Sequence, residues 1–272
     1  MTSLSFYTRL LLWNLPSLAF QLKTGGTLGV LVLYGKLTWF LFTRKTWMRG
    51  RAMTFEFCFE ELRFTLALKY PVDIAPLVEL YVDGEYAHTR RSDVKVIIDL
   101  GANYGDSAIY LHACYPQARI YAVEPSPTSF ERLKAHAAPF PEIVPVQGMV
   151  GGKTEEGTLY LNGAGALGNS MTARDAVASV AVPSYTLGDL LHVCGVEKAD
   201  IIKFDIEGAE DQLFGEQSPA HYASMYIGEV HEDLMGVTKE NFLNYFKDFT
   251  VTVRPLKNKY RSILIATTKQ NQ

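Results

Sequence analysis

The stretch that most constrains the fold is Val94–Gly105, which reads Val-Lys-Val-Ile-Ile-Asp-Leu-Gly-Ala-Asn-Tyr-Gly. Its first half is apolar and rich in β-branched residues, as is typical of a strand buried on both faces of a parallel sheet. Two glycines follow, and Asp106–Tyr115 then carries apolar side chains at helical spacing. This order predicts a strand, a tight turn and a helix, which together bind nucleotide-like ligands at the carboxyl edge of open α/β sheets.

The chain after this stretch alternates between strand-like and helix-like segments. We predict strands at 118–123, 143–146, 199–206 and 225–230, and helices at 128–137, 186–193, 207–214 and 239–246. This alternation indicates an α/β fold with a doubly wound, mostly parallel, Rossmann-like sheet. Two late strands, 249–253 and 262–267, are joined by a short polar loop and predict a C-terminal antiparallel hairpin on the sheet edge.

Residues 1–52 differ from the rest, because they are densely apolar and aromatic and end in a basic run between Arg44 and Arg51. Pro16 and Gly25-Gly26 divide them into at least two helical pieces. We therefore predict an N-terminal helical segment, 1–52, and a catalytic domain, 53–272. The segment either packs on the domain or on a second subunit, lies in a membrane interface with the basic run on anionic lipid, or spans the bilayer.

Composition excludes some classes of function. The net charge is −3 and no basic stripe is visible, which argues against a nucleic-acid partner. The three cysteines, Cys58, Cys114 and Cys194, are far apart in apolar surroundings and read as reduced thiols of a cytosolic protein. We expect a cytoplasmic location; both membrane readings of the N-terminus place the domain on the cytoplasmic face.

The glycine turn discriminates between ligands. A dinucleotide site needs a middle glycine where this chain has Asn103, so a pyrophosphate would meet side chains. S-adenosylmethionine fits better, with its amino-acid part over the turn and its ribose at the end of the next strand. Glu124 ends that strand and is placed to accept hydrogen bonds from the ribose hydroxyls; the alternative is a helix N-terminal charge. Asp99 is expected mainly to hold the loop by accepting backbone N–H bonds, and also to reach the ligand's ammonium group indirectly.

Three motifs carry a resemblance to a known family. Asp99-Leu-Gly-Ala-Asn-Tyr-Gly105, Glu124-Pro125 and above all Lys203-Phe-Asp-Ile-Glu-Gly-Ala-Glu210 resemble the FkbM family of S-adenosylmethionine-dependent methyltransferases, over roughly residues 77–270. The resemblance implies a class I methyltransferase fold and transfer of a methyl group to a hydroxyl of a sugar, glycan or other natural product. Gly188-Asp189 stands where the family often has two adjacent acids.

The residues predicted to contact the cofactor, S-adenosyl-L-methionine, lie after the first two strands and at the start of the third motif. They are Asp99, Gly101, Asn103, Gly105, Glu124, Pro125 and Asp205. Two other functions remain as alternatives: a nucleotide-dependent oxidoreductase, and a catalytically inactive, cofactor-binding protein associated with a membrane.

A second set of residues is predicted to carry the catalytic chemistry. Hydroxyl methylation needs a base close to the acceptor, and Asp205, Glu207 and His231 all follow predicted strands at the carboxyl edge. Histidine has the intrinsic pKa best suited to this, but the sequence does not choose among the three. The loop at 163–170 is a candidate acceptor lid.

For two other charged residues of this region we expect structural roles. Lys203 is expected to pair with one of the acids, and Glu210 to be a surface charge in the first turn of a helix. Together with Glu229 the catalytic acids and His231 make an alternative divalent-metal site. Their spacing does not require one, so no metal is predicted.

Overall fold

The computed structural model describes residues 35, 39, 51–81, 83–161, 178–214, 218–256, 258 and 260–269. The chain divides into two compact units, Met1–Ala87 and His88–Gln272. Nearly all of the segment 1–52 and the whole loop 163–170 lie outside the described residues, so the helical segment, its boundary and the lid stay predictions. Within the described residues, no helix has the length and apolar character needed to cross a bilayer.

The first unit contains a β-hairpin and a short helix. Strands β1 (Met53–Phe59) and β2 (Leu62–Leu68) pair antiparallel, and α3 (Ile74–Tyr81) follows a 3₁₀ turn. The sequence indicates one strand at the start of 54–69 and a short helix at 77–82; the structure has two strands in the first stretch and α3 at the second. The hairpin forms because Glu60 turns with a positive φ of 53°, and because apolar residues alternate along both strands.

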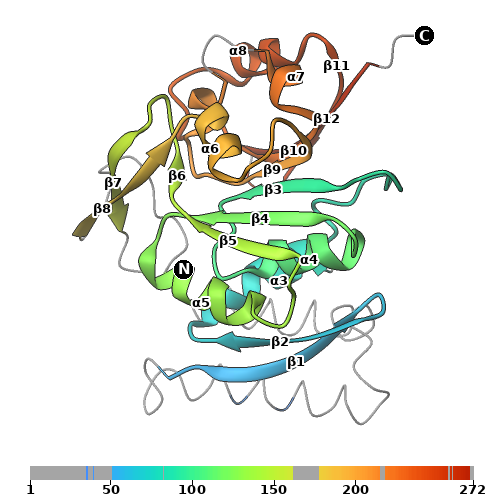
Figure 1. Cartoon of the computed structure of the whole chain (residues 1–272), viewed down its shortest axis with the longest axis vertical. Coiled ribbons are helices and arrows are strands. Elements are labelled where there is room, and N and C mark those ends of the chain that lie inside the picture. The colour runs from blue at the N-terminus through green and yellow to red at the C-terminus, as the bar shows by residue number, and fades with distance from the viewer. Residues whose placement is uncertain are drawn as a thin grey trace. The chain divides into compact units, whose positions relative to one another are not determined.

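The second unit is built on the predicted doubly wound sheet (Figure 1). Among the described residues, seven strands lie in the order β11-β12-β10-β9-β3-β4-β5. Their bounds are β3 (Val96–Leu100), β4 (Arg119–Glu124), β5 (Ile143–Gln147), β9 (Ala199–Phe204), β10 (Ala223–His231), β11 (Phe249–Pro255) and β12 (Arg261–Thr268). Strands β3, β4, β5, β9 and β10 run parallel, whereas β12 is antiparallel to both β10 and β11. The Rossmann-like fold and the C-terminal hairpin are confirmed.

Helices cover both faces of this sheet. In Figure 1, α4 (Asp106–Cys114) and α5 (Pro127–Ala137) lie on one side, and α6 (Leu187–Val193), α7 (Pro219–Tyr222) and α8 (Lys239–Leu243) lie on the other. Ile98, Leu100 and Phe204 from the central strands share one apolar core with Leu190 of α6 and Phe242 of α8. The core thus holds the carboxyl ends of β3 and β9 in fixed positions.

Two parts of the second unit differ from the sequence prediction. The helix expected at 207–214 is wrong: only a 3₁₀ turn, Glu210–Gln212, forms, because Glu207 and Gly208 have φ values of 50° and 97° that an α-helix excludes. The short strands that the sequence indicates at 158–161 and 180–182 are longer in the structure, as β7 (Glu155–Leu161) and β8 (Ala178–Tyr185). With β6 (Met149–Val150) they form a small separate sheet, in the order β6-β8-β7, that was not predicted.

The turn after β3 touches the segment after β9. Gly101 has a φ of 74°, and a Cβ built on it would lie 1.9 Å from the carbonyl oxygen of Asp205. The backbone N–H of Asp205 donates to the carbonyl oxygen of Leu100 with an N···O distance of 3.1 Å. Glycine is required here both for its conformation and for the absence of a side chain.

This contact generates a prediction about stability. Gly101→Ala should lower the melting temperature by several degrees, because alanine disfavours positive φ by about 1 kcal/mol and its methyl group would displace the Asp205 backbone. Thermal unfolding by circular dichroism measures the effect. Gly152→Ala is the matched control, since nothing lies within 4 Å of a Cβ at that position. Equal melting temperatures for the two variants would contradict the argument.

Candidate active site

The glycine turn is held in place by Glu124 at the end of β4. One carboxylate oxygen of Glu124 accepts from the backbone N–H of Asn103 at 2.9 Å and the other from that of Ser126 at 2.8 Å. Asn103 has a positive φ of 46°, and Gly105, with a φ of 98°, precedes helix α4. Glu124 therefore links the turn to the start of helix α5, and Pro125 lies half-buried between them.

Glu124 is only 7% exposed. Burial raises its pKa to about 7, although the hydrogen bonds from Ser126 and Asn103 oppose this shift. Each carboxylate oxygen has a further lone pair, so both can accept another donor besides the backbone. The structure thus brings together the turn and the strand-end acid that the sequence predicted for the cofactor.

Asp99 and Lys203 form a buried ion pair between β3 and β9. The Nζ atom of Lys203 lies 3.0 Å from Oδ1 of Asp99, and both side chains are almost fully buried. The same ammonium group donates to the carbonyl oxygens of Gly101 at 3.0 Å and Leu100 at 3.3 Å. Ser107 donates to the other oxygen of Asp99 at 2.7 Å. The structural role expected for Lys203 is present, but its ion pair is with Asp99, beneath the turn, whereas the sequence pointed to an acid of its own motif, Asp205 or Glu207.

The motif at 203–210, which begins at the end of β9, turns back toward β10. Glu210 is fully buried and accepts from Nδ1 of His231 at 2.5 Å and from the backbone N–H of Gly208 at 3.3 Å. The prediction that Glu210 is a surface charge is therefore wrong. It rested on a helix at 207–214, whereas the left-handed backbone at Glu207 and Gly208 turns Glu210 inward.

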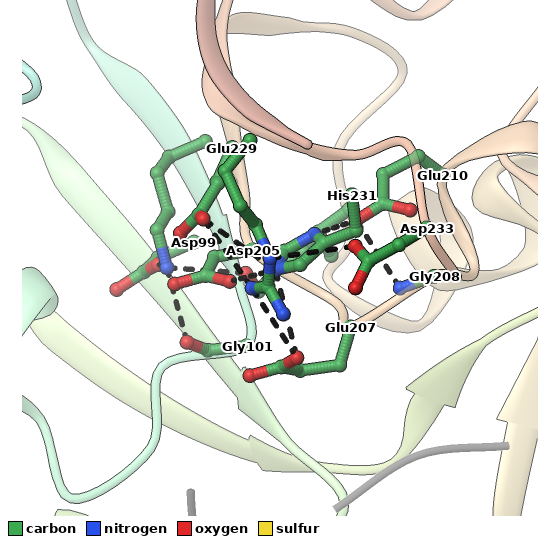
Figure 2. A network of polar contacts seen from close by, with 12 residues as sticks. Asp99, Gly101, Asp205, Glu207, Gly208, Glu210, Glu229, His231 and Asp233 are labelled. Carbon is green, nitrogen blue, oxygen red and sulfur yellow. Dashed lines mark hydrogen bonds and ion pairs between the residues drawn. The ribbon is translucent and has the colours of Figure 1, made fainter. Parts of the chain in front are cut away.

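The other ring nitrogen of His231 faces three carboxylates. Nε2 lies 3.5 Å from Glu207, 3.6 Å from Asp205 and 3.8 Å from Glu229. Figure 2 shows His231 between Glu210 on one side and Asp205 and Glu229 on the other. We call Asp205, Glu207 and Glu229 the acid cluster. The three residues predicted to be catalytic are thus brought together, with Glu229 beside them.

Arg261 was missed by the sequence reasoning. It begins β12, which pairs with β10 so that Arg261 stands opposite His231. Its guanidinium lies 3.3 Å from Glu229, 3.7 Å from Glu207 and 3.6 Å from Asp233. The sequence placed Arg261 in the hairpin loop, and only the register between β10 and β12 reveals its position.

Burial and neighbouring charges both shift the pKa values in this region. Burial, followed by the charge of Asp205, raises the pKa of Glu229 to about 7 and also raises that of Glu207. Burial lowers the pKa of His231, but the hydrogen bond and charge of Glu210 outweigh it and raise the pKa to about 9. Four carboxyl groups, those of Asp205, Glu207, Glu210 and Glu229, surround His231, and Arg261 lies beside two of them. This excess of acids favours a further cation in the cluster.

Comparison with known proteins agrees with the motifs. The profile of the methyltransferase FkbM domain matches residues 99–260, which is more than half of the chain. The chain belongs to the FkbM methyltransferase family. The predicted resemblance is confirmed, and the glycine turn, Glu124 and the acid cluster are parts of an FkbM methyltransferase domain.

Individual relatives are distant. Methyltransferase sdnD of Sordaria araneosa is 26% identical over 177 residues, which cover 53% of this chain and 68% of that protein. Hexuronic acid methyltransferase AglP of Haloferax volcanii is 26% identical over 148 residues, covering 53% of this chain and 60% of that protein. The alignment thus spans less than two thirds of AglP. The crystal structure of an FkbM methyltransferase from Methylobacillus flagellatus is 15% identical with a TM-score of 0.45, covering 74% of this chain and 56% of that one.

The buried ion pair of this FkbM domain yields a prediction. Lys203→Met should destabilise the protein by about 3–5 kcal/mol, because it leaves Asp99 buried without its counter-charge. Denaturant unfolding measures the loss. Lys95→Met makes the same substitution at an exposed position just before β3 and should change stability by about 0.5 kcal/mol or less. A similar small effect at Lys203 would show that the pair does not hold the strands.

Proposed function

We propose that this FkbM methyltransferase transfers a methyl group from S-adenosyl-L-methionine to a hydroxyl of a sugar, glycan or other natural product. One observation carries the proposal: the cofactor turn and the acid cluster meet at the Gly101–Asp205 contact. A cofactor over the turn would have its ribose at Glu124 and its sulfonium toward Asp205. Asp99, Asn103, Gly105 and Pro125 would support or border the cofactor around the same turn.

The chemistry is an in-line displacement. The acceptor oxygen attacks the methyl carbon, a C–O bond forms, the C–S bond breaks, and S-adenosylhomocysteine leaves with the electron pair on sulfur. The hydroxyl proton must go to a base within hydrogen-bond reach. The side chains of Asp205 and Glu207 are 32% and 25% exposed, whereas that of His231 is 0% exposed. We therefore assign proton acceptance to the acid cluster, and to His231 a role in positioning its carboxylates.

The acceptor class is supported by one relative. AglP, which is 26% identical to this chain, is named a hexuronic acid methyltransferase. A uronic acid carries hydroxyl groups next to a carboxylate, and Arg261 lies at the edge of the acid cluster. We therefore place sugars, including uronic acids, first among the acceptors to be screened.

The proposed reaction is tested by separating binding from transfer. Glu124→Gln should weaken S-adenosylhomocysteine binding about tenfold or more in calorimetry, whereas the exposed Glu131→Gln should not. Glu207→Gln should leave this affinity within about threefold and lower the transfer rate about 100-fold on the acceptor found in the screen. Thermal protection by NAD without protection by S-adenosylhomocysteine would overturn the assignment in favour of an oxidoreductase.

The raised pKa of Glu124 predicts a pH dependence of cofactor binding. The protonated carboxyl group cannot accept from both ribose hydroxyls, so affinity should fall as pH drops through about 7. Between pH 8 and pH 6 the Kd for S-adenosylhomocysteine should rise about tenfold. The matched control is Glu124→Gln, whose weaker binding should be independent of pH over this range. A wild-type Kd that stays constant would show that the ionised carboxylate is not needed.

A further inference from the structure

His231 carries a buried nitrogen without a hydrogen bond. The residue is 0% exposed, and Nε2 has no hydrogen-bond partner among the described residues. Such an atom normally costs free energy, because buried polar groups lose their water. The ring nevertheless aims Nε2 into the acid cluster, as Figure 2 shows. A ligand that fits between the nitrogen and the carboxylates would satisfy it.

The distances around Nε2 suit a metal ion. The carboxylate oxygens of Asp205 and Glu207 lie 3.6 and 3.5 Å away, which is too long for a good hydrogen bond. Two ligand atoms on one ion cannot be farther apart than the sum of two bonds, about 4.2 Å for nitrogen and oxygen ligands. Asp205, Glu207 and His231 each offer one atom in a group within 4.8 Å. Small side-chain rotations would bring all three onto one ion.

The Nδ1 side of the His231 ring is also arranged as in metal sites. Nδ1 of His231 donates to the buried carboxylate of Glu210, which fixes the ring and leaves Nε2 to face the cluster. A carboxylate on the far nitrogen is the usual partner of a metal-ligating histidine. Glu210 is itself held by the backbone N–H of Gly208, so the orientation does not depend on the cluster.

We propose that Asp205, Glu207 and His231 hold a divalent cation of the Mn²⁺ type. One imidazole and two carboxylates suit such an ion, whose remaining coordination positions would be open to substrate.

The cation would bind the acceptor directly. This role rests on the proposed methyl transfer, whereas the binding of the ion is independent of it. An acceptor with two neighbouring oxygens, such as a vicinal diol or a hydroxyl beside a carboxylate, would chelate the ion. The bound hydroxyl would lose its proton more readily. That proton passes to Glu229, the third member of the acid cluster, as the oxygen takes the methyl group.

The test measures Mn²⁺ binding by the full-length protein after treatment with a chelator. Titration followed by the electron paramagnetic resonance signal of free Mn²⁺ should show one ion bound per chain. Asp205→Asn should raise the Kd at least tenfold, because it removes a ligand. Asp233→Asn is the matched control: it removes a carboxylate that faces Arg261 and is outside the ligand set, and it should change the Kd by no more than about threefold.

Two results would overturn the metal site: no stoichiometric Mn²⁺ binding by the folded wild-type protein, or equal weakening by Asp205→Asn and Asp233→Asn. Binding of S-adenosylhomocysteine to the same metal-free protein is measured in parallel by calorimetry. If S-adenosylhomocysteine binds and Mn²⁺ does not, only the metal site is contradicted. If Mn²⁺ binds at Asp205 and S-adenosylhomocysteine does not bind, the cation site is supported and the proposed cofactor is wrong.

Discussion

The ion pair between Lys203 and Asp99 is the interaction on which the site depends. It joins β9 to β3 in the middle of the sheet, where neither charge reaches solvent. The ammonium group also binds the carbonyls of Leu100 and Gly101, so it fixes the first residues of the turn. A buried pair of this kind stabilises little compared with apolar residues, but it allows few alternative arrangements. Its effect here is to align the turn after β3 with the motif after β9.

The parts that the sequence predicted well are those with local signals. Alternating strands and helices gave the Rossmann-like sheet, and the glycines with Glu124 gave the turn and the strand-end acid, because each depends on neighbours in the chain. Glu210 and Arg261 could not be predicted in this way. Glu210 turns inward because of two left-handed residues that interrupt the expected helix, and Arg261 reaches the site through the pairing of β12 with β10.

Buried and partly exposed groups have different roles in and around the acid cluster. His231 and Glu210 are fully buried and fix the geometry, whereas Asp205 and Glu207 are partly exposed and face the solvent side. Glu207 also holds a backbone conformation with positive φ, which is unfavourable for residues other than glycine. Strain of this kind is retained where a side chain must point in one direction, and here it directs a carboxylate toward His231.

The strand order has a consequence for how the site is assembled. Strand β12 lies between β10 and β11, although it follows both in the chain, so β11 has no place in the sheet until β12 is present. Among the described residues, strand β11 is therefore joined to the sheet through β12 alone, and the pairing of β12 with β10 also places Arg261 opposite His231. Loss of this one pairing would separate both the sheet edge and the guanidinium group from the acid cluster. The charge balance of the site thus depends on the strand at which the parallel sheet gives way to antiparallel pairing.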